Sequence, residues 1–186
     1  MGVELVPVAV AIVLAAVLAW AVVAYNGLVR RRNRVEATWS DVDVLLRRRH
    51  DLVPNLVSTV GGYVRHEAAV LRAVAEARSA ALAASGPAAQ ERAESALSSN
   101  VKSVLAVAED YPDLKASTAF VELQDRLTAT EDGLEHARHF YNDSVYGYMT
   151  ATQTLPTSLI AALFGFRPHQ YFQAAGSERT PVTVRT

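Results

Sequence analysis

An uncharged apolar run at the start of the chain is followed by apolar positions with helical spacing. Residues 5–24 contain eleven Leu, Ile or Val side chains and no charged side chain. Twenty helical residues rise about 30 Å, which matches the hydrocarbon core of a bilayer. Trp20 and Tyr25 lie near the end of the run, where amphipathic rings favour the headgroup region. The pattern predicts a transmembrane helix that contacts the lipid bilayer through residues 5–25.

The charges that flank this run predict its orientation. Glu4 is the only charged side chain before it, whereas four arginines follow it, at positions Arg30, Arg31, Arg32 and Arg34. By the positive-inside rule we expect a single-pass protein of the cell membrane, with the N-terminus outside and the C-terminal domain cytoplasmic. The alternative is a signal peptide cleaved after Val22-Val23-Ala24. A signal peptide has a basic n-region and an apolar stretch of about 7–15 residues, and this run has neither, so a retained anchor is favoured.

The spacing of apolar residues beyond the run predicts four helices. The first continues from the span to about His50, with a stripe formed by Leu28, Val35, Trp39, Val42 and Leu46. Asp51 and Pro54 predict a stop and a restart, because Asp favours an N-cap and Pro is tolerated in a first turn. The other helices are expected over residues 51–84, 88–110 and 117–153. In the last of these, apolar residues recur every seven positions at Phe120, Leu127, Leu134, Tyr141 and Tyr148.

These helices, joined by short links with almost no strand signal, predict an all-α fold. We expect a single N-terminal transmembrane helix that continues into an antiparallel up-and-down four-helix bundle. The predicted organisation is an anchor over residues 1–25, a helical bundle domain over residues 26–172 and a C-terminal tail over residues 173–186.

In such a bundle the fourth helix returns to the membrane, and an apolar segment, residues 155–166, follows it. The segment is too short to span a bilayer. A hydrophobic plug over the end of the bundle is the favoured interpretation, because closing a core needs no further partner. An interfacial segment that rests on the inner leaflet is the alternative.

Composition and charge narrow the functional classes. Hydrophobic residues make up 51% of the chain and charged residues 20%, which excludes a disordered chain. The net charge of −1 argues against nucleic acid as a partner, because phosphate binding needs a basic excess. The basic excess is local: residues 26–50 hold seven Arg against three acidic residues. The chain has no cysteine, which removes disulfides, thiolate metal sites and cysteine nucleophiles.

The patterns of catalytic and metal sites are absent or incomplete. His66-Glu67 begins like a zinc-protease helix, but position 70 is Val rather than the second His ligand. No Glu is followed by His three residues later, as a di-iron bundle requires. His136 and His139 share a helix face with Asp132 and Glu135, and a solvated polar face is favoured there over a metal site. We therefore expect no catalytic residues, no cofactor and no metal.

Two polar sets remain. Arg47-Arg48-Arg49 is interpreted as a solvated helix end, and contact with a polyanion is the alternative. We expect several members of the second set to face the seam between helices and to fix its register, with a partner-docking surface as the alternative. That set is Asn26, Asn33, Glu36, Asn55, Asn142 and Asp143.

Short motifs in order along residues 25–172 resemble the LemA family of bacterial membrane-anchored helical proteins. They include Tyr25-Asn26-Gly27-Leu28-Val29, Asp51-Leu52-Val53-Pro54-Asn55-Leu56-Val57, Tyr111-Pro112-Asp113-Leu114-Lys115-Ala116, Phe140-Tyr141-Asn142-Asp143 and Leu163-Phe164-Gly165-Phe166. Met149 and Leu155 depart from the family pattern. The resemblance implies one N-terminal membrane helix, a soluble LemA-like bundle over residues 26–172 and no established enzymatic activity. Relatives take part in building bacterial membrane organelles.

These observations predict a non-enzymatic single-pass membrane protein whose cytoplasmic bundle acts as a scaffold or adaptor for membrane-associated partners. The protein partners are unknown, and a homo-oligomer is possible. The alternatives are a membrane-remodelling or organelle-forming protein, or an accessory protein with a cryptic His and carboxylate metal site.

Overall fold

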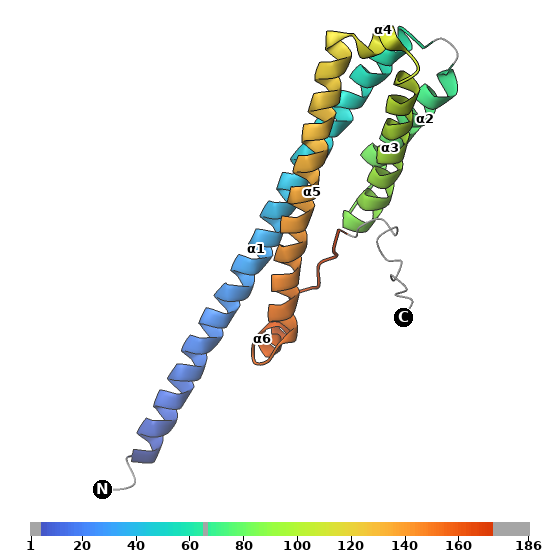
Figure 1. Ribbon diagram of the computed structural model, residues 1–186. Coiled ribbons are helices and arrows are strands. Elements are labelled where there is room, and N and C mark those ends of the chain that lie inside the picture. Colours follow the sequence, from blue (N-terminus) through green and yellow to red (C-terminus); the bar gives the residue numbers. More distant parts are fainter. Residues whose placement is uncertain (1–4, 65–66, 173–186) are drawn as a thin grey trace, which may run out of the picture. The chain divides into compact units, whose positions relative to one another are not determined.

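The protein is helical throughout the residues that its structure describes (Figure 1). The computed structural model describes residues 5–64 and 67–172, except for the side chain of Leu5. Its helices are α1 (Leu5–Gly61), α2 (Ala68–Ala83), α3 (Pro87–Ala108), α4 (Pro112–Lys115), α5 (Thr118–Gln153) and α6 (Thr157–Leu163). No strand occurs in these two ranges, which confirms the all-α prediction. The predicted tail, residues 173–186, lies outside the described residues.

Contacts between Cα atoms divide the chain into two compact units. The first, which we call the anchor unit, comprises residues 1–39 and 141–169. The second, the head unit, comprises residues 40–140 and 170–186. Each of the two long helices, α1 and α5, contributes residues to both units. The division into an anchor, one bundle domain and a tail stays a prediction.

The start of α1 presents an apolar surface to the surroundings. The large apolar side chains on its surface between Val6 and Val23 have exposed fractions from 39% to 67%. The most apolar window of α1 has a mean hydropathy of 2.8, and none of that window is buried. Among the described helices, α1 alone is long and apolar enough to cross a membrane. This agrees with the predicted span, and a signal sequence near an N-terminus passes the same test of length and apolarity.

Farther along α1, the anchor unit has a packed interior. Leu28 and Val35 of α1 and Val145 and Tyr148 of α5 are all buried. The rings of Trp39 and Tyr141 lie 5.2 Å apart between centroids, and the hydroxyl of Tyr148 donates a 2.8 Å hydrogen bond to the carbonyl of Arg167. The stripes predicted for the first and last long helices are therefore confirmed in this unit.

The head unit has a separate apolar core. The core combines the last part of α1 with α2, α3, α4 and the first part of α5. Its buried members are Leu52, Val53, Leu56, Val60, Val64, Val74, Ala81, Leu97, Val101, Val104, Ala108, Leu114, Phe120, Leu123 and Leu127. Phe120 and Leu127 belong to the stripe predicted for the last helix. The up-and-down four-helix arrangement of the whole bundle stays a prediction.

The predicted break at Asp51 and Pro54 is wrong, because α1 continues through Pro54 to Gly61. A proline inside a helix has no N–H and leaves the carbonyl four residues earlier without its donor, which here is the carbonyl of His50. The Arg78 side chain of α2 replaces that donor: its Nε lies 2.7 Å from the His50 oxygen. The helix ends instead at Gly61-Gly62, where glycine disfavours helix, and the second helix is correspondingly shorter than predicted.

The plug interpretation of residues 155–166 describes only part of that segment. Ile160 and Ala161 of α6 are buried against Ala24 and Leu28, as a plug requires. The other large apolar side chains face outwards, with exposed fractions from 58% to 77% at Leu155, Leu159, Leu163 and Phe164.

We predict that Arg78 matters because Pro54 is present. Replacing Arg78 by Met should lower the free energy of unfolding by about 1–3 kcal/mol, since the buried His50 carbonyl then lacks a donor. In a Pro54→Ala background the new N–H supplies that donor, and the same substitution should cost less than about 1 kcal/mol. Urea unfolding of the full chain in detergent measures the four proteins of this cycle. Equal costs in the two backgrounds would show that Arg78 acts in another way.

Candidate functional site

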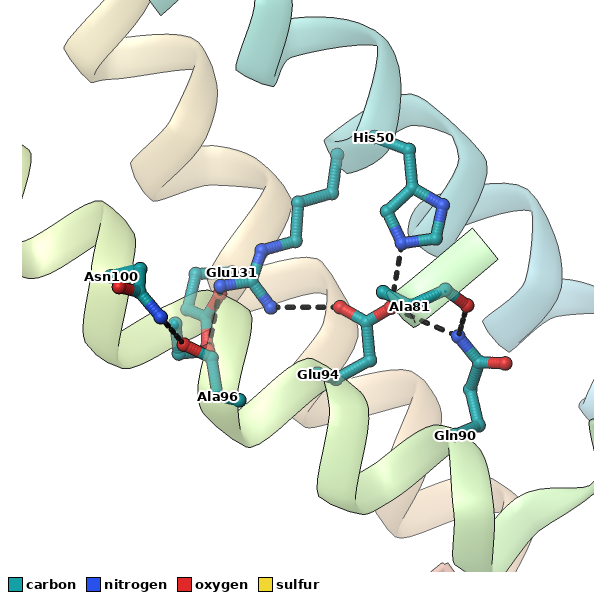
Figure 2. Close-up of polar contacts among 9 residues, drawn as sticks. His50, Ala81, Gln90, Glu94, Ala96, Asn100 and Glu131 are labelled. Atoms are coloured by element: carbon teal, nitrogen blue, oxygen red, sulfur yellow. Dashed lines mark hydrogen bonds and ion pairs between the residues drawn. The ribbon is translucent and has the colours of Figure 1, made fainter. Parts of the chain in front are cut away.

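A group of charged and polar side chains is buried inside the head unit (Figure 2). We call it the charge cluster, and its members are Arg49 and His50 of α1, Gln90 and Glu94 of α3, and Glu131 of α5. The side chains of Arg49, His50 and Glu94 are 4%, 5% and 0% exposed. Buried charges are costly unless they are paired and hydrogen-bonded, so the contacts of Glu94 decide whether this arrangement is stable.

Glu94 lies at the centre of the cluster, and both of its carboxylate oxygens accept hydrogen bonds. Arg49 Nη1 donates to Oε2 at 3.2 Å. Oε1 lies 2.6 Å from His50 Nε2 and accepts a 3.0 Å bond from Gln90 Nε2. An ionised carboxylate only accepts hydrogen bonds, so Nε2 of His50 is the donor. The amide nitrogen of Gln90 also lies 3.1 Å from the carbonyl of Ala81 in α2.

Arg49 also connects the cluster to α5. Its Nη2 donates to Ser98 Oγ at 2.6 Å and lies 3.3 Å from Glu131 Oε2, whose side chain is 48% exposed. Arg49 therefore joins a fully buried acid to a partly solvated one. Two acids and one arginine leave no uncompensated positive charge at this point of the core.

The partners of Glu94 keep it ionised. Burial by itself raises the pKa of a carboxyl group, because it disfavours the charged form. The hydrogen bond and charge of His50, the charge of Arg49 and the hydrogen bond from Gln90 outweigh burial, and the pKa of Glu94 is lower than its ordinary value of 4.5. The cluster thus holds a carboxylate, rather than a neutral acid, within an apolar core.

The helical register explains why these charges are buried. Arg49 follows the buried Leu46 by three residues and precedes the buried Val53 by four, so it lies on the apolar stripe of α1. Glu94 precedes the buried Leu97 by three residues on α3. The interpretation of Arg47-Arg48-Arg49 as a solvated helix end holds for Arg47 and Arg48, which are exposed, and is wrong for Arg49.

A second cation, the half-buried Arg138 of α5, lies near this cluster. The guanidinium carbon of Arg138 on α5 is 4.7 Å from the ring centroid of Phe172, and its Nε makes no hydrogen bond. Burial is the largest influence on Arg138 and lowers its pKa, whereas the charge of Glu131 acts in the opposite direction. Glu131 therefore influences both the buried Arg49, by direct contact, and the half-buried Arg138, by its charge.

Unlike the buried charge cluster, a second polar feature of the head unit is an open groove with a cationic lining. We call it the arginine groove: a hollow of about 560 Å³ lined by Val44, Arg47, Arg48, Asp51, Leu52, Asn55 and Arg126. Val44 is 61% exposed, and three cations outnumber the single acid of the lining. Arg47 forms a 2.7 Å ion pair with Asp43 along α1. Among the described residues, Arg48 and Arg126 of the groove form no ion pair within 4.0 Å.

The anchor unit has a hollow of its own, of about 400 Å³, lined mostly by small side chains of α1 and α5. Its single charged lining residue is Arg31, whose Nη1 donates a 3.2 Å hydrogen bond to the carbonyl of Gly147. Because that cation already has a partner, the hollow offers a ligand little beyond apolar contact.

Four of the six residues that were predicted to fix the helix seam do not lie in it. Asn26, Asn33, Glu36 and Asn55 are exposed, so the prediction is wrong for these four. Asn142 is half-buried and Asp143 is exposed. The physical reason is their spacing: they fall beside the stripe rather than on it, whereas Arg49 and Glu94 fall on it.

The metal alternative gains no geometric support. His136 and His139 are both exposed on α5. Within residues 5–64 and 67–172, no three His, Asp or Glu side chains gather closely enough to hold a metal ion. His66 of the incomplete zinc-protease pattern lies outside the described residues. The charge cluster has two acids, a histidine and an arginine, but its central carboxylate has no exposed surface at which a substrate could meet it.

We predict that Glu94 makes the stability of the protein sensitive to acid. The lowered pKa means that its ionised form stabilises the fold fully above pH 4.5, and that this contribution is lost as the pH falls through the pKa of the folded state. Glu94→Gln should cost about 3–5 kcal/mol at neutral pH, since it removes the fully buried partner of the Arg49 charge. The variant should also lose this part of the pH dependence.

Urea unfolding of the full chain in detergent between pH 3 and pH 7, roughly the range in which carboxyl groups titrate, gives both values. Glu76→Gln is the matched control, because Glu76 is an exposed acid of α2 in the same unit. The double variant Arg49→Met with Glu94→Met should be more stable than Glu94→Gln, because it removes both charges together. Parallel pH curves for the wild type and Glu94→Gln would contradict this role.

Comparison with known proteins agrees with the resemblance seen in the sequence. A family model described as the LemA family matches residues 38–185. This range contains all the described residues of the head unit, and it begins within α1, after the apolar run of residues 5–24. No curated protein matches the chain. The match covers most of the sequence, and the chain therefore belongs to the LemA family.

Proposed function

We propose that this LemA family protein is a single-pass protein of the cell membrane, with its N-terminus outside and a non-enzymatic helical bundle in the cytoplasm that acts as a scaffold for membrane-associated partners. The observation that carries the proposal is the surface of α1. Between Val6 and Val23 its large apolar side chains are exposed along the whole length of the run. In water this surface is unfavourable, whereas in hydrocarbon it is the surface that a spanning helix requires.

The arginines after the run support the proposed orientation. Arg30, Arg31, Arg32 and Arg34 are all exposed. Among the described residues, one of these four arginines forms an ion pair: Arg32 Nε lies 3.8 Å from Glu36 Oε1. The pair is on the surface and is therefore weak. Exposed arginines next to a span favour the cytoplasmic side and attract anionic headgroups. Because cleavage would remove the anchor, the proposal also requires that residues 1–24 remain in the mature protein.

The head unit supports a scaffold role more than an enzymatic one. Its most unusual polar group, Glu94, is sealed from solvent and already bonded to three side chains. Its open polar surface, the arginine groove, instead combines a cationic rim with the exposed apolar side chain of Val44. That combination suits an acidic amphipathic segment of a partner protein, with electrostatic attraction at the rim and apolar contact at Val44.

Anchoring would strengthen such contacts without any change in the groove. A protein confined to the membrane meets other membrane-associated proteins at a high effective concentration, so that a weak groove contact can suffice. A scaffold of this kind needs a rigid head. The charge cluster supports such a role, because its hydrogen bonds and ion pairs connect α1, α3 and α5.

We expect the anchor to stay attached and the head to be cytoplasmic. In intact cells, a cysteine introduced near the N-terminus at Gly2 should react with a membrane-impermeant maleimide, and one introduced at the exposed Ser99 should react only after lysis. The chain has no cysteine of its own, so the background is zero. Mass spectrometry of the purified protein should find residues 1–24. Loss of these residues, or labelling of position 99 in intact cells, would contradict the proposal.

We also expect partner capture to depend on the charge of the arginine groove. Proximity labelling in cells that express the full chain should enrich a set of membrane-associated neighbours. Reversing the groove charges, Arg48→Glu with Arg126→Glu, should remove part of that set. The control Arg72→Glu with Arg92→Glu changes two exposed cations of α2 and α3 by the same total charge. No enrichment in the wild type would contradict the scaffold role, and equal loss in both variants would contradict the role of the groove.

A further inference from the structure

A short apolar face of the anchor unit is largely exposed. It follows α5 and consists of Leu155, Leu159, Leu163 and Phe164, which are 77%, 63%, 76% and 58% exposed. We call it the α6 face. Leu159 and Leu163 are four residues apart and share one side of α6. No charged residue occurs between Asp143 and Arg167, so nothing in this stretch opposes burial in an apolar environment.

The contacts of α6 place this face at the point where the apolar run of α1 ends. Ile160 and Ala161 pack against Ala24 and Leu28. The Tyr25 ring lies 4.9 Å from the ring of Phe164 and 5.7 Å from that of Phe166, in edge-on geometry. Figure 1 shows α6 at the end of α5, beside α1, with the earlier part of α1 extending beyond it. The α6 face is therefore held at the level of Tyr25.

Cations begin directly after this level. Arg30 to Arg34 follow Tyr25 by about 8–14 Å along a helix that rises 1.5 Å per residue. The guanidinium carbon of Arg32 lies 5.7 Å from the ring centroid of Phe166. The order along α1 is thus an apolar run, an aromatic group that contacts α6, and then a set of arginines. This is the order of the hydrocarbon core, the interface and the anionic headgroup surface of a cytoplasmic leaflet.

We propose that the α6 face inserts into the cytoplasmic leaflet of the membrane as a second lipid contact beside the span of α1. The occupant is phospholipid, with acyl chains against Leu159 and Leu163 and anionic headgroups at Arg30 to Arg34. The proposal rests on the proposed anchoring of α1. Two contacts, joined through Tyr25 and the packing of Ile160, fix the anchor unit against the membrane surface and limit its rotation, which a single span does not do.

The absence of native cysteine permits a direct test in the full chain. Single variants Leu159→Cys and Leu163→Cys report on the α6 face, and both positions are exposed, so the packing of Ile160 and Ala161 remains intact. Val13→Cys reports on the span, and Leu82→Cys, an exposed leucine of α2, is the aqueous control. Each variant is labelled with an environment-sensitive nitrobenzoxadiazole dye and reconstituted into phosphatidylcholine vesicles that contain phosphatidylglycerol.

Lipids that carry a nitroxide on the acyl chain should quench the dye at positions 159 and 163 several-fold more strongly than at position 82. Quenching at position 13 should be strong as well. If position 13 is quenched while positions 159 and 163 behave like position 82, the α6 contact is wrong and the anchor stands. If position 13 is not quenched, the anchor and the α6 contact both fail. A blue-shifted dye at position 163 without lipid quenching would show that a second copy covers the face, which also overturns the proposal.

Discussion

One turn of α1 connects every long helix of the head unit, and the rest of that unit depends on it. Arg49 bonds to Glu94 of α3 and lies against Glu131 of α5, while the ring of His50 bonds to the other oxygen of Glu94. The backbone carbonyl of His50 accepts a hydrogen bond from Arg78 of α2. Apolar stripes alone can slide past one another by a turn at modest cost, because one Leu contact resembles the next. A buried carboxylate with three donors has one register in which it is satisfied.

Pro54 and Arg78 belong to the same arrangement. The proline frees a carbonyl of α1 at the level of the charge cluster, and α2 supplies the donor that the helix itself lacks. A defect in one helix becomes a specific contact with another. The position of α2 is thus determined by a directional hydrogen bond as well as by the burial of Val74 and Ala81. Removing the defect would make α1 more regular but would also remove a reason for α2 to dock at that turn.

The sequence predicted the elements of this fold better than its polar interior. Heptad spacing located the buried side of α5 at Phe120, Leu127 and Leu134, because apolar periodicity reports directly on burial. The local signals at Asp51 and Pro54 predicted a break that does not occur. The donor that compensates for Pro54 belongs to Arg78, which is 28 positions away from His50. Local propensity contains no information about such a partner. The helix ends instead at Gly61-Gly62, where two adjacent glycines disfavour the helical conformation.

The charge cluster was missed for a different reason, and a signal for it was present. Arg49 continues the spacing of Leu46 and Val53, and Glu94 that of Leu97, so each charge interrupts an otherwise apolar stripe. Arg47 and Arg48 lie off this stripe, so the three adjacent arginines do not share one environment. A charged residue in the stripe of one helix is expensive by itself, and opposite charges in the stripes of two helices of one unit can pair. The pairing partner and its distance remain beyond sequence reasoning, because they depend on how the helices are placed.

The head unit buries charged side chains, whereas the anchor unit exposes apolar ones. The head unit encloses an acid, a histidine and an arginine and satisfies them with one another, so their charges are stable in an apolar core. The anchor unit exposes a long apolar run and a short apolar face, and leaves its arginines on the surface. Each side chain lies where its surroundings compensate it: a partner for the buried charge, and a surrounding medium for the exposed apolar group. An exposed apolar surface of this extent is unfavourable in water, and α1 is long and apolar enough to cross a membrane.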